Sequence, residues 1–499
     1  MPPNHQYPLN LGHFIDGDWI EPDSGDRIEV RDPCNIDRVV GSVPIASTQA
    51  LTAVVDAAAA AFETWSHLPA ATRSEHMQRA AAGIEDAADR IGRVVADELA
   101  RPLPDAVNEV HAAARQFRYY AEEAVRIRGA ITQSDIADEE VLLLNRPVGV
   151  VLVVSPWNNP LFLLSRFVAP ALATGCTVIA KPPSEGPLST LLLTEAMHAA
   201  GLPGGVFNVV TGRGEAVARP LLARPEVRKA CLTGGVAAGR ALMTAAAEQL
   251  KTTALELGGQ CPAIVCEDAQ LPTTAEAIAF QAFRQGGQVC NRVNRVYAHE
   301  NVYDELVGML KDRIATIRVG AVDDPDTDYA ALINKHQLAT AQQHVDDALA
   351  KGARLETGGT QLLGDGFDRG WFFAPTLLSG CQPDTLVMTE ETFGPVLGIT
   401  SYRDFDEALC QANDTPYGLS AFVFTQNAMR CHRAMHTLEA GSIWINDIHL
   451  SYPQCPYGGY KTSGTGRTQG IEVMQEFHEQ TTVYWDFADY ERSTRKSGH

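Results

Sequence analysis

Residues 148–181 read VGVVLVVSPWNNPLFLLSRFVAPALATGCTVIAK and contain the alternation that decides the fold. Two almost wholly apolar runs, GVVLVVSPW and GCTVIAKP, predict buried strands, and the segment between them predicts a helix. A third such run, GVFNVVTG, follows the helix-like segment STLLLTEAMHAAG. Strands that are apolar on both faces and alternate with helices are typical of a parallel sheet covered by helices. We therefore predict a doubly wound α/β fold.

A second series of short apolar runs begins near residue 261 and predicts a second α/β domain. We expect its strands at CPAIVCEDA, NRVYAHE, ALINK, WFFAPTLLSG, LGITSYRD, SAFVFTQN and GSIWINDI. Residues 50–127 are alanine-rich, with apolar residues at three- and four-residue spacing, which indicates helices. The extended stretch 131–146 and the C-terminal EFHEQTTVYWDFADYER are expected to pair as an outlying sheet.

The composition of the 499-residue chain argues against several classes of protein. A formal net charge of −21 without a Lys/Arg cluster disfavours nucleic-acid binding. The N-terminus lacks the pattern of a signal peptide, and the longest apolar run is broken by Pro156, well short of a membrane span. Ten scattered cysteines without a CxxC pair predict free thiols in a reducing cytoplasm. No His, Cys or Asp cluster has metal-ligand spacing, so we predict no metal site.

Ligands of an open parallel sheet bind at the carboxyl ends of its strands, so the loops after the apolar runs matter most. These loops are VSPWNNP, AKPPSEGP, VVTGRGEAVA and CLTGGVAAGR. The Gly212/Gly214 pair is as typical of a simple turn as of a phosphate site. TGGVAAG is the stronger signal, because glycines at a helix start expose backbone N–H groups to an anion. Lys181 adds a positive charge near any such phosphate.

Three further groups have chemical potential, namely Asn158, Glu256 in LELGGQ and Cys290 in GGQVC. Singly, each has an ordinary structural explanation as a turn former, a loop carboxylate or a buried small side chain. The ordered set PWNNP, KPPSEGP, LTGGVAAGR, LELGG, GGQVC, EETFGPV and PYGGYKTSGTGR, however, resembles the aldehyde dehydrogenase superfamily. The resemblance runs from IDGDWIEPDSG to GIEVMQEF and so covers almost the whole chain.

The resemblance implies a covalent mechanism for oxidising an aldehyde. Cys290, as thiolate, would attack the aldehyde carbon, with the oxyanion held by the Asn158 amide and the Cys290 backbone N–H. After hydride transfer to a nicotinamide, Glu256 would act as general base for hydrolysis of the thioester. Relatives that pass the acyl group to coenzyme A often lack this carboxylate, so Glu256 favours a free acid as product.

The resemblance also implies a dinucleotide cofactor, either NADP or NAD. The positions that match the family's cofactor contacts are Trp157, Lys181, Ser184, Thr233, Gly234, Gly235, Gly239, Glu391 and Phe393. NAD-specific members usually carry Glu three residues after the lysine, where this chain has Ser184 and only then Glu185. A hydroxyl beside an ammonium suits a 2′-phosphate, which favours NADP. The chain departs from the family at Gly235, Asn159 and Phe167, which affects details of cofactor binding and not the reaction.

Three polar residues match positions that hold the far carboxylate of the substrate in succinate semialdehyde dehydrogenases: Arg166, Arg284 and Ser451. Two guanidinium groups in a tunnel are costly to desolvate unless an anion completes them, so we expect a carboxylated semialdehyde. The alternative for either arginine is a nearby protein carboxylate. Asn159 and Tyr457 leave room for an aromatic or other bulky aldehyde. A catalytically silent structural relative would be expected to lose Cys290 or Glu256, so the enzyme is favoured.

The resemblance divides the chain into three parts. Residues 1–127 and 148–257 are expected to form a Rossmann-like dinucleotide-binding domain, and residues 258–470 a catalytic domain. Segments 128–147 and 471–499 are expected to form a small protruding β element that makes a homodimer or a homotetramer.

Overall fold

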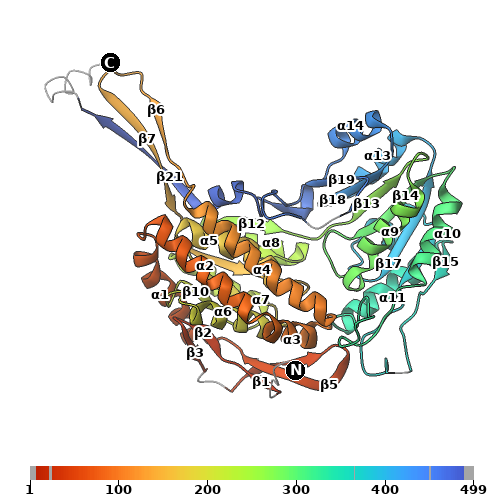
Figure 1. Ribbon diagram of the computed structural model, residues 1–499, viewed down its shortest axis with the longest axis horizontal. Coiled ribbons are helices and arrows are strands. Elements are labelled where there is room, and N and C mark those ends of the chain that lie inside the picture. Colours follow the sequence, from red (N-terminus) through yellow and green to blue (C-terminus); the bar gives the residue numbers. More distant parts are fainter. Residues whose placement is uncertain (1–6, 22–24, 365, 449–450, 488–499) are drawn as a thin grey trace.

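The computed structural model describes residues 7–21, 25–364, 366–448 and 451–487 (Figure 1). Its largest sheet has the order β20-β12-β11-β8-β9-β10-β2-β3. The five central strands are parallel: β12 (Thr252–Glu256), β11 (Val227–Thr233), β8 (Val150–Val154), β9 (Thr177–Lys181) and β10 (Phe207–Val209). Helices follow the predicted runs, so the doubly wound α/β fold is confirmed.

Antiparallel strands that the sequence pattern did not indicate close both edges of this sheet. They are β2 (His13–Ile15), β3 (Asp18–Ile20) and β20 (Gly464–Thr465). Strand β20 comes from the segment assigned to the second domain, and it pairs with β12 at Leu255 and Glu256. The C-terminal part of the chain therefore supports the strand that ends in Glu256.

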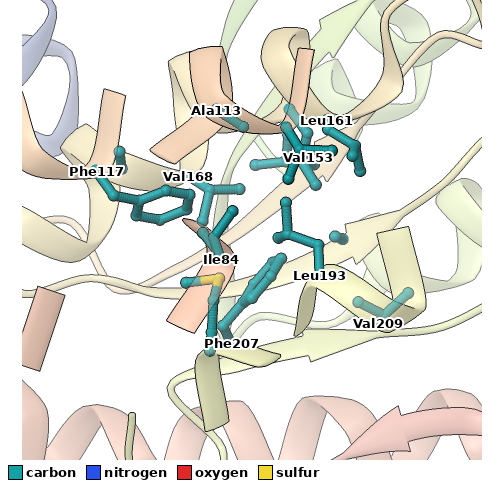
Figure 2. Close-up of a cluster of buried hydrophobic side chains, with 14 of the residues drawn as sticks. Ile84, Ala113, Phe117, Val153, Leu161, Val168, Leu193, Phe207 and Val209 are labelled. Carbon is teal, nitrogen blue, oxygen red and sulfur yellow. The ribbon is translucent and has the colours of Figure 1, made fainter. Parts of the chain in front are cut away.

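Eight helices pack on the first sheet or on one another beside it. They are α1 (Thr48–Trp65), α2 (Ala70–Asp86), α3 (Ala88–Leu99), α4 (Leu103–Ala124), α5 (Pro160–Thr174), α6 (Leu188–Ala199), α7 (Gly214–Ala223) and α8 (Val236–Ala247). Figure 2 shows how Ile84, Phe117, Val168 and Phe207 from α2, α4, α5 and β10 meet in one buried cluster. This core fixes α4 against α5 and α5 against β8, and residues of α4 and α5 line the cavity of the candidate site.

The second sheet has the order β15-β16-β17-β14-β13-β18-β19 and is parallel except for β15. Its strands are β13 (Cys261–Val265), β14 (Val293–His299), β15 (Arg354–Thr357), β16 (Thr376–Ser379), β17 (Val396–Tyr402), β18 (Ser420–Phe424) and β19 (Ser442–Ile445). Its helices are α9 (Leu271–Phe283), α10 (Tyr303–Ile314), α11 (Lys335–Ala350), α12 (Leu386–Thr389), α13 (Phe405–Asn413) and α14 (Ala428–Thr437). Short 3-10 helices are η1 (Arg284–Gly287), η2 (Lys461–Ser463) and η3 (Glu472–Phe477).

One predicted strand of this sheet, ALINK at residues 331–335, is wrong. The Leu332 N–H donates to the Trp371 carbonyl at 2.9 Å, and the Ile333 N–H donates to the Gln288 side chain at 2.9 Å. Asn334 then caps α11 through its side chain. The apolar residues of ALINK are buried, but a loop and a side chain satisfy their backbone instead of a sheet ladder.

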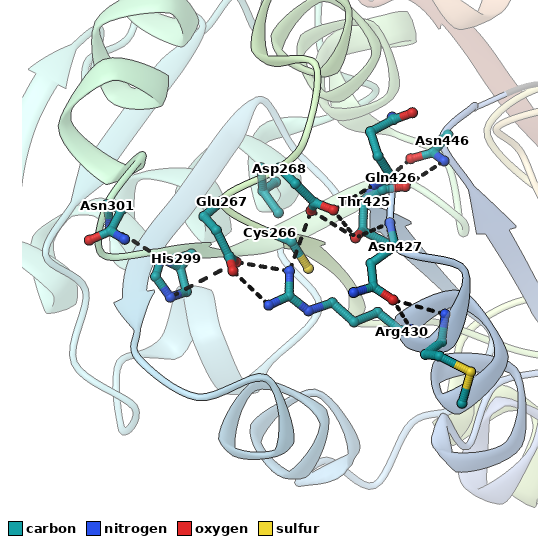
Figure 3. A network of polar contacts seen from close by, with 12 residues as sticks. Cys266, Glu267, Asp268, His299, Asn301, Thr425, Gln426, Asn427, Arg430 and Asn446 are labelled. Carbon is teal, nitrogen blue, oxygen red and sulfur yellow. Dashed lines mark hydrogen bonds and ion pairs between the residues drawn. The ribbon is translucent and has the colours of Figure 1, made fainter.

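A polar network ties together the ends of three parallel strands of the second sheet (Figure 3). Arg430 binds Glu267 at 2.6 Å and Asp268 at 3.4 Å, just after β13. The Asn446 side chain, just after β19, accepts from the Thr425 N–H at 2.9 Å and donates to the Thr425 carbonyl at 2.7 Å. Asn446 has a positive φ of 56°, so this contact fixes the direction in which the chain leaves β19 toward Ser451.

Two smaller sheets lie outside the main layers. The N-terminal one contains β1 (Leu9–Asn10), β4 (Arg27–Asp32) and β5 (Asn35–Pro44). The other protrudes from the body in Figure 1 and contains β6 (Ala130–Gln133), β7 (Glu139–Pro147) and β21 (His478–Asp486). Strands β7 and β21 pair antiparallel along their whole length, so the predicted pairing is confirmed. The end of the predicted tail, residues 488–499, lies outside the described residues.

Within the described ranges, no helix combines the length and the apolar character needed to cross a membrane. All ten cysteines lie in these ranges, and all ten are free thiols. The same ranges contain no group of three or more His, Cys, Asp or Glu residues arranged to hold a metal ion.

Candidate active site

A cavity of about 580 Å³ lies between helices α4 and α5 and the loops of the second sheet. Seven residues singled out from the sequence line it: Asn158, Asn159, Arg166, Arg284, Cys290, Ser451 and Tyr457. The volume falls within the range of ligand pockets that enclose small molecules. The structure thus brings the predicted nucleophile and all five predicted substrate residues to one cavity.

The loop that carries Cys290 requires glycine. After α9, Gln285, Gly286 and Gly287 all have positive φ values, of 56°, 62° and 71°. A Cβ on Gly287 would lie 2.3 Å from the carbonyl oxygen of Gly394, which no side chain tolerates. This left-handed turn reverses the chain and leaves Cys290 half-buried at the wall of the cavity.

Glu256, at the end of β12, contacts the predicted nucleophile. The Cys290 thiol lies 3.8 Å from Glu256 Oε1, and the Glu256 side chain is buried, with 1% of its surface exposed. Thr233 Oγ1 donates to the second carboxylate oxygen at 3.4 Å. Burial and the nearby Glu256 carboxylate raise the pKa of Cys290, while Arg166 acts in the opposite direction. The thiol therefore holds its proton in this state, with a carboxylate next to it that can accept the proton.

Asn158 lies directly against the Cys290 loop. Its side-chain amide donates to the Gln288 carbonyl at 3.0 Å, and the residue is almost completely buried. Its own carbonyl accepts from Arg101 at 3.3 Å and from the Gln285 side chain. Asn158 is therefore held from both ends, as a fixed hydrogen-bond donor beside a reacting atom has to be.

Arg101 is a component of the site that sequence reasoning missed. It lines the cavity, forms a buried ion pair with Glu109 and donates to Asn159 Oδ1 at 2.8 Å. Glu109 Oε1 in turn accepts from the backbone N–H groups of Leu161 and Phe162, which caps the start of α5. No local pattern indicates this role, because Arg101 lies in a short break between α3 and α4, far from Asn159 in sequence.

The two predicted substrate arginines have different surroundings. Arg166 forms an ion pair with Glu256 at 3.3 Å and donates to Ser451 Oγ at 2.8 Å. Its guanidinium also lies over the rings of Phe162 and Tyr457, at 4.5 and 4.8 Å from their centroids. The alternative left open for Arg166, a protein carboxylate as partner, is therefore what the structure contains.

Arg284, by contrast, has neutral partners. It donates to Gln281 Oε1 and to Asn291 Oδ1, each at 3.0 Å, and burial lowers its pKa to about 10. Among the described residues, no carboxylate lies within ion-pair distance of it. Two buried donors of the same cavity, Arg166 Nε and the Tyr457 hydroxyl, also lack a hydrogen-bond partner in the described part of the chain. The cavity thus has positive charge and donor groups in excess.

Most of the predicted cofactor residues follow β9 and β11, at the carboxyl ends of these strands or in the helix α8 after β11. Lys181 ends β9, and burial lowers its pKa to about 8. Ser184 donates to the Gly212 carbonyl at 3.4 Å, where Gly212 forms a turn with φ of 148°. These groups lie on one loop cluster at the first sheet, as a dinucleotide site requires.

The TGGVAAG segment forms the start of α8, as predicted. A Cβ on Gly235 would meet nothing, and one on Gly239 would meet Leu257 at 2.7 Å. Gly235 therefore leaves the helix N-terminus open, and Gly239 allows the helix to pack on the sheet. The N–H of Gly234, however, donates to the Glu256 carbonyl at 3.0 Å, so it is already used within the protein.

On the side of the site toward the second sheet, Trp157 and Phe393 form an edge-to-face pair with centroids 5.4 Å apart. Glu391 Oε1 accepts from the Gly259 N–H at 3.1 Å, and burial raises the pKa of Glu391 to about 7. The ammonium of Lys181, the carboxyl group of Glu391 and the open α8 N-terminus are groups that fit the phosphates and ribose hydroxyls of a dinucleotide.

Comparisons with known proteins agree with this arrangement. The profile described as "Aldehyde dehydrogenase family" matches residues 19–483. The chain is 37% identical over 93% of its length to an aspartate-semialdehyde dehydrogenase (non-phosphorylating) of Halomonas elongata, of which 94% is covered. It is 37% identical over 93% of its length to the succinate-semialdehyde dehydrogenase [NADP(+)] of Escherichia coli K12, of which 96% is covered. The crystal structure of lactaldehyde dehydrogenase from Escherichia coli matches with a TM-score of 0.93 and 34% identity, covering 96% of this chain and 100% of that one.

The fold and the site therefore define a dinucleotide-dependent oxidoreductase, and the chain belongs to the aldehyde dehydrogenase family. It is an NAD(P)-dependent aldehyde dehydrogenase, an enzyme that oxidises aldehydes.

Proposed function

We propose that this enzyme oxidises a carboxylated semialdehyde, such as succinate semialdehyde, to the corresponding dicarboxylic acid. The observation that carries the proposal is Arg284, a half-buried guanidinium in the cavity wall that has only neutral protein partners and whose pKa is lowered by desolvation. A buried cation without an acid is costly, and the far carboxylate of a substrate removes that cost. Two of the similar proteins, from Halomonas elongata and Escherichia coli, are named as semialdehyde dehydrogenases, which supports the same substrate class.

In the proposed first step, Glu256 accepts the thiol proton of Cys290, and the sulfur attacks the aldehyde carbon to form a thiohemiacetal. The Asn158 amide and the Cys290 backbone N–H stabilise the oxyanion that develops on the former carbonyl oxygen. A nicotinamide held by the proposed cofactor residues would supply the hydride acceptor for this carbon, which would then remain on Cys290 as a thioester.

The second step hydrolyses the thioester. Glu256 first passes the proton taken from Cys290 to solvent and is again a carboxylate. It then removes a proton from a water molecule, the water oxygen attacks the thioester carbon, and the carbon–sulfur bond breaks. The products are the free acid and the Cys290 thiolate. Because Glu256 is present and contacts Cys290, we propose a non-acylating enzyme that does not transfer the acyl group to coenzyme A.

For the cofactor we propose NADP in preference to NAD. Lys181 and Ser184 offer an ammonium and a hydroxyl to a 2′-phosphate, while Glu185 is exposed on the same loop. Trp157, Thr233, Gly234, Gly235, Gly239, Glu391 and Phe393 are proposed to hold the remainder of the dinucleotide.

The aromatic or bulky aldehyde remains a second candidate because of one observation. The cavity of about 580 Å³ is larger than a four-carbon substrate fills, and Phe162, Phe280 and Tyr457 contribute aromatic surface to it. A substrate with a ring uses this surface, whereas succinate semialdehyde leaves part of it to water.

We also propose that the enzyme is cytoplasmic, in line with its free thiols. The protruding sheet supports a further proposal, that the enzyme is a homodimer or a homotetramer. Strand β21 exposes 71% of Tyr484 and 58% of Trp485, and strand β6 exposes 70% of Ile131. Large apolar side chains on the free edges of a sheet are typical of a surface that pairs with a second copy. The division into a dinucleotide-binding part, a catalytic part and this oligomerisation element is proposed with the boundaries given above.

The substrate proposal is tested by steady-state kinetics with succinate semialdehyde, butanal and benzaldehyde. Replacement Arg284→Ala is expected to raise KM for succinate semialdehyde by about tenfold or more, as the loss of one charged contact does. Butanal, which lacks the carboxylate, is the control and should keep its KM. An unchanged KM for succinate semialdehyde, or a wild-type preference for benzaldehyde, would contradict the proposal.

A further inference from the structure

The carboxylate proposed as general base is bound to one of the proposed substrate arginines. Arg166 Nη1 contacts both oxygens of Glu256, at 3.3 and 3.4 Å. Both side chains are buried, with 5% of Arg166 and 1% of Glu256 exposed. Glu256 Oε1 also lies 3.8 Å from the Cys290 thiol. The Arg166 guanidinium, the Glu256 carboxylate and the Cys290 thiol therefore form a continuous chain of contacts.

The guanidinium itself is held in place independently of Glu256. Phe162 and Tyr457 lie against it, at 4.5 and 4.8 Å, and Ser451 accepts from its other terminal nitrogen at 2.8 Å. Its Nε has no hydrogen-bond partner among the residues that the structure describes, although it is buried. Arg166 is therefore a fixed cation in the cavity wall with capacity for a second anionic partner.

A substrate carboxylate that enters this cavity competes with Glu256 for the same cation. A carboxylate that binds Nε and Nη2 displaces only Ser451, whereas one that binds the two terminal nitrogens takes Nη1 from Glu256 and Nη2 from Ser451. In the second case Glu256 loses the only cation with which it forms an ion pair in the described part of the chain. An anionic substrate bound to both terminal nitrogens thus changes the state of the catalytic base as well as its own position.

We propose that Arg166 holds Glu256 in the empty enzyme and exchanges it for the far carboxylate of the substrate, so that substrate binding releases the base for hydrolysis of the thioester. This inference rests on the proposed function. While Arg166 contacts both of its oxygens, the Glu256 carboxylate has fewer lone pairs left to accept a proton from water. Arg166 is therefore a positioning residue whose effect falls on turnover, whereas Arg284 affects substrate affinity.

Hydrolysis of the acyl-enzyme is measured without an aldehyde by using p-nitrophenyl butanoate. The ester acylates Cys290 and releases nitrophenolate in a burst, and the steady rate that follows reports attack of water on the butanoyl thioester. Added sodium acetate provides a free carboxylate for Arg166, with sodium chloride at equal ionic strength as control. A freed general base contributes about 10²–10⁴-fold to rate, so we expect a saturable acceleration by acetate of at least about tenfold. Absence of acceleration, or inhibition by acetate, would overturn the inference.

The substitution Arg166→Met removes the guanidinium for which acetate and Glu256 compete. The butanoyl thioester is then expected to hydrolyse at the same rate with and without acetate. Arg166→Lys keeps a cation and should restore part of the acetate response. An undiminished acetate response in Arg166→Met would count against the exchange. Because the variant leaves a buried carboxylate without its partner and is at risk of misfolding, the acetate experiment on the wild-type enzyme is decisive by itself.

Failure of this inference is distinguishable from failure of the proposed function. If KM for succinate semialdehyde is no lower than KM for butanal, the substrate assignment is wrong, and the exchange, which rests on it, falls with it. If the semialdehyde has the lower KM but acetate has no effect on the butanoyl-enzyme, the substrate assignment stands and only the exchange at Arg166 is wrong.

Discussion

The Cys290 thiol and the Glu256 carboxylate lie 3.8 Å apart, although 34 residues separate them in the chain. Cys290 follows a left-handed turn after α9, and Glu256 ends β12 of the other sheet. The proposed catalytic pair therefore spans the junction of the two sheets, where α4 and α5 close the cavity from the side.

Replacement Glu256→Gln keeps the size of the side chain but removes the base. We expect both the burst of reduced cofactor and the steady turnover to slow, the steady turnover by about 10²–10⁴-fold, because Glu256 is proposed to accept a proton in acylation and again in hydrolysis. Rapid-mixing absorbance measurements of the reduced nicotinamide give both phases. Cys290→Ala is the control and should show no burst, and a normal steady rate in Glu256→Gln would exclude this carboxylate as the base.

The Tyr457 hydroxyl is a buried donor without a partner among the described residues, in the wall of the cavity. If it binds substrate, Tyr457→Phe should raise KM for succinate semialdehyde about fivefold, the equivalent of roughly 1 kcal/mol for one hydrogen bond. The free enzyme should keep its melting temperature or gain a little, because an unsatisfied hydroxyl has been removed. A lower melting temperature with unchanged KM would assign the hydroxyl a purely structural role.

Burial lowers the pKa of Lys181 to about 8, and this predicts a pH dependence that differs between the two cofactors. Below pH 8 the side chain is charged and attracts a 2′-phosphate, whereas above pH 8 it is neutral. KM for NADP is therefore expected to rise as the pH increases through about 8, while KM for NAD, which has no 2′-phosphate, changes less. Parallel pH profiles for the two cofactors would speak against this role.

Ser184→Glu tests the same assignment at a fixed pH. A carboxylate at this position repels the 2′-phosphate and accepts from ribose hydroxyls, so the ratio of kcat/KM for NADP over NAD should fall by about tenfold or more. A wild-type ratio well below one would contradict the proposed preference for NADP.

Phe207 is fully buried in the core beneath α2 and α6 (Figure 2). Replacement Phe207→Ala should destabilise the enzyme by about 3–5 kcal/mol, through lost apolar contact and the cavity that remains. Thermal unfolding with a fixed scan rate measures the loss. Val236→Ala at the half-buried start of α8 is the matched control and should cost much less.

The protruding sheet predicts how the enzyme assembles. The double substitution Ile131→Asp and Tyr484→Asp places charges on exposed apolar positions of β6 and β21, and should convert an oligomer to smaller species in analytical ultracentrifugation. Met429→Asp, on an equally exposed position of α14, should leave the assembly unchanged. A mass distribution unaffected by the double substitution would rule out this sheet as the contact.

Much of this architecture follows from local features of the chain. Strands β8, β9 and β10 are nearly continuous apolar runs, and glycine is required before Cys290 because a Cβ on Gly287 would collide with the Gly394 carbonyl. By contrast, β2, β3 and β20 are strands of two or three residues, too short to carry a periodic signal, and the sheet edge alone specifies them. The apolar run ALINK was misleading, because burial alone does not distinguish a strand from a buried loop.

The sequence by itself determined the two α/β layers and the order of the motifs, because these depend on side-chain type and spacing within one segment. The proposed roles of Cys290, Glu256 and Asn158 came from the family resemblance that those motifs carry. Only the tertiary structure decided how the charges pair. Arg166 is bound to Glu256, 90 residues away, whereas Arg284 is left with neutral partners, although both are arginines on helical segments beside the same cavity. The partner of a buried charge depends on which groups the packed helices and strands bring within a few ångströms of it. Local sequence does not predict that distance, because the two groups come from segments far apart in the chain.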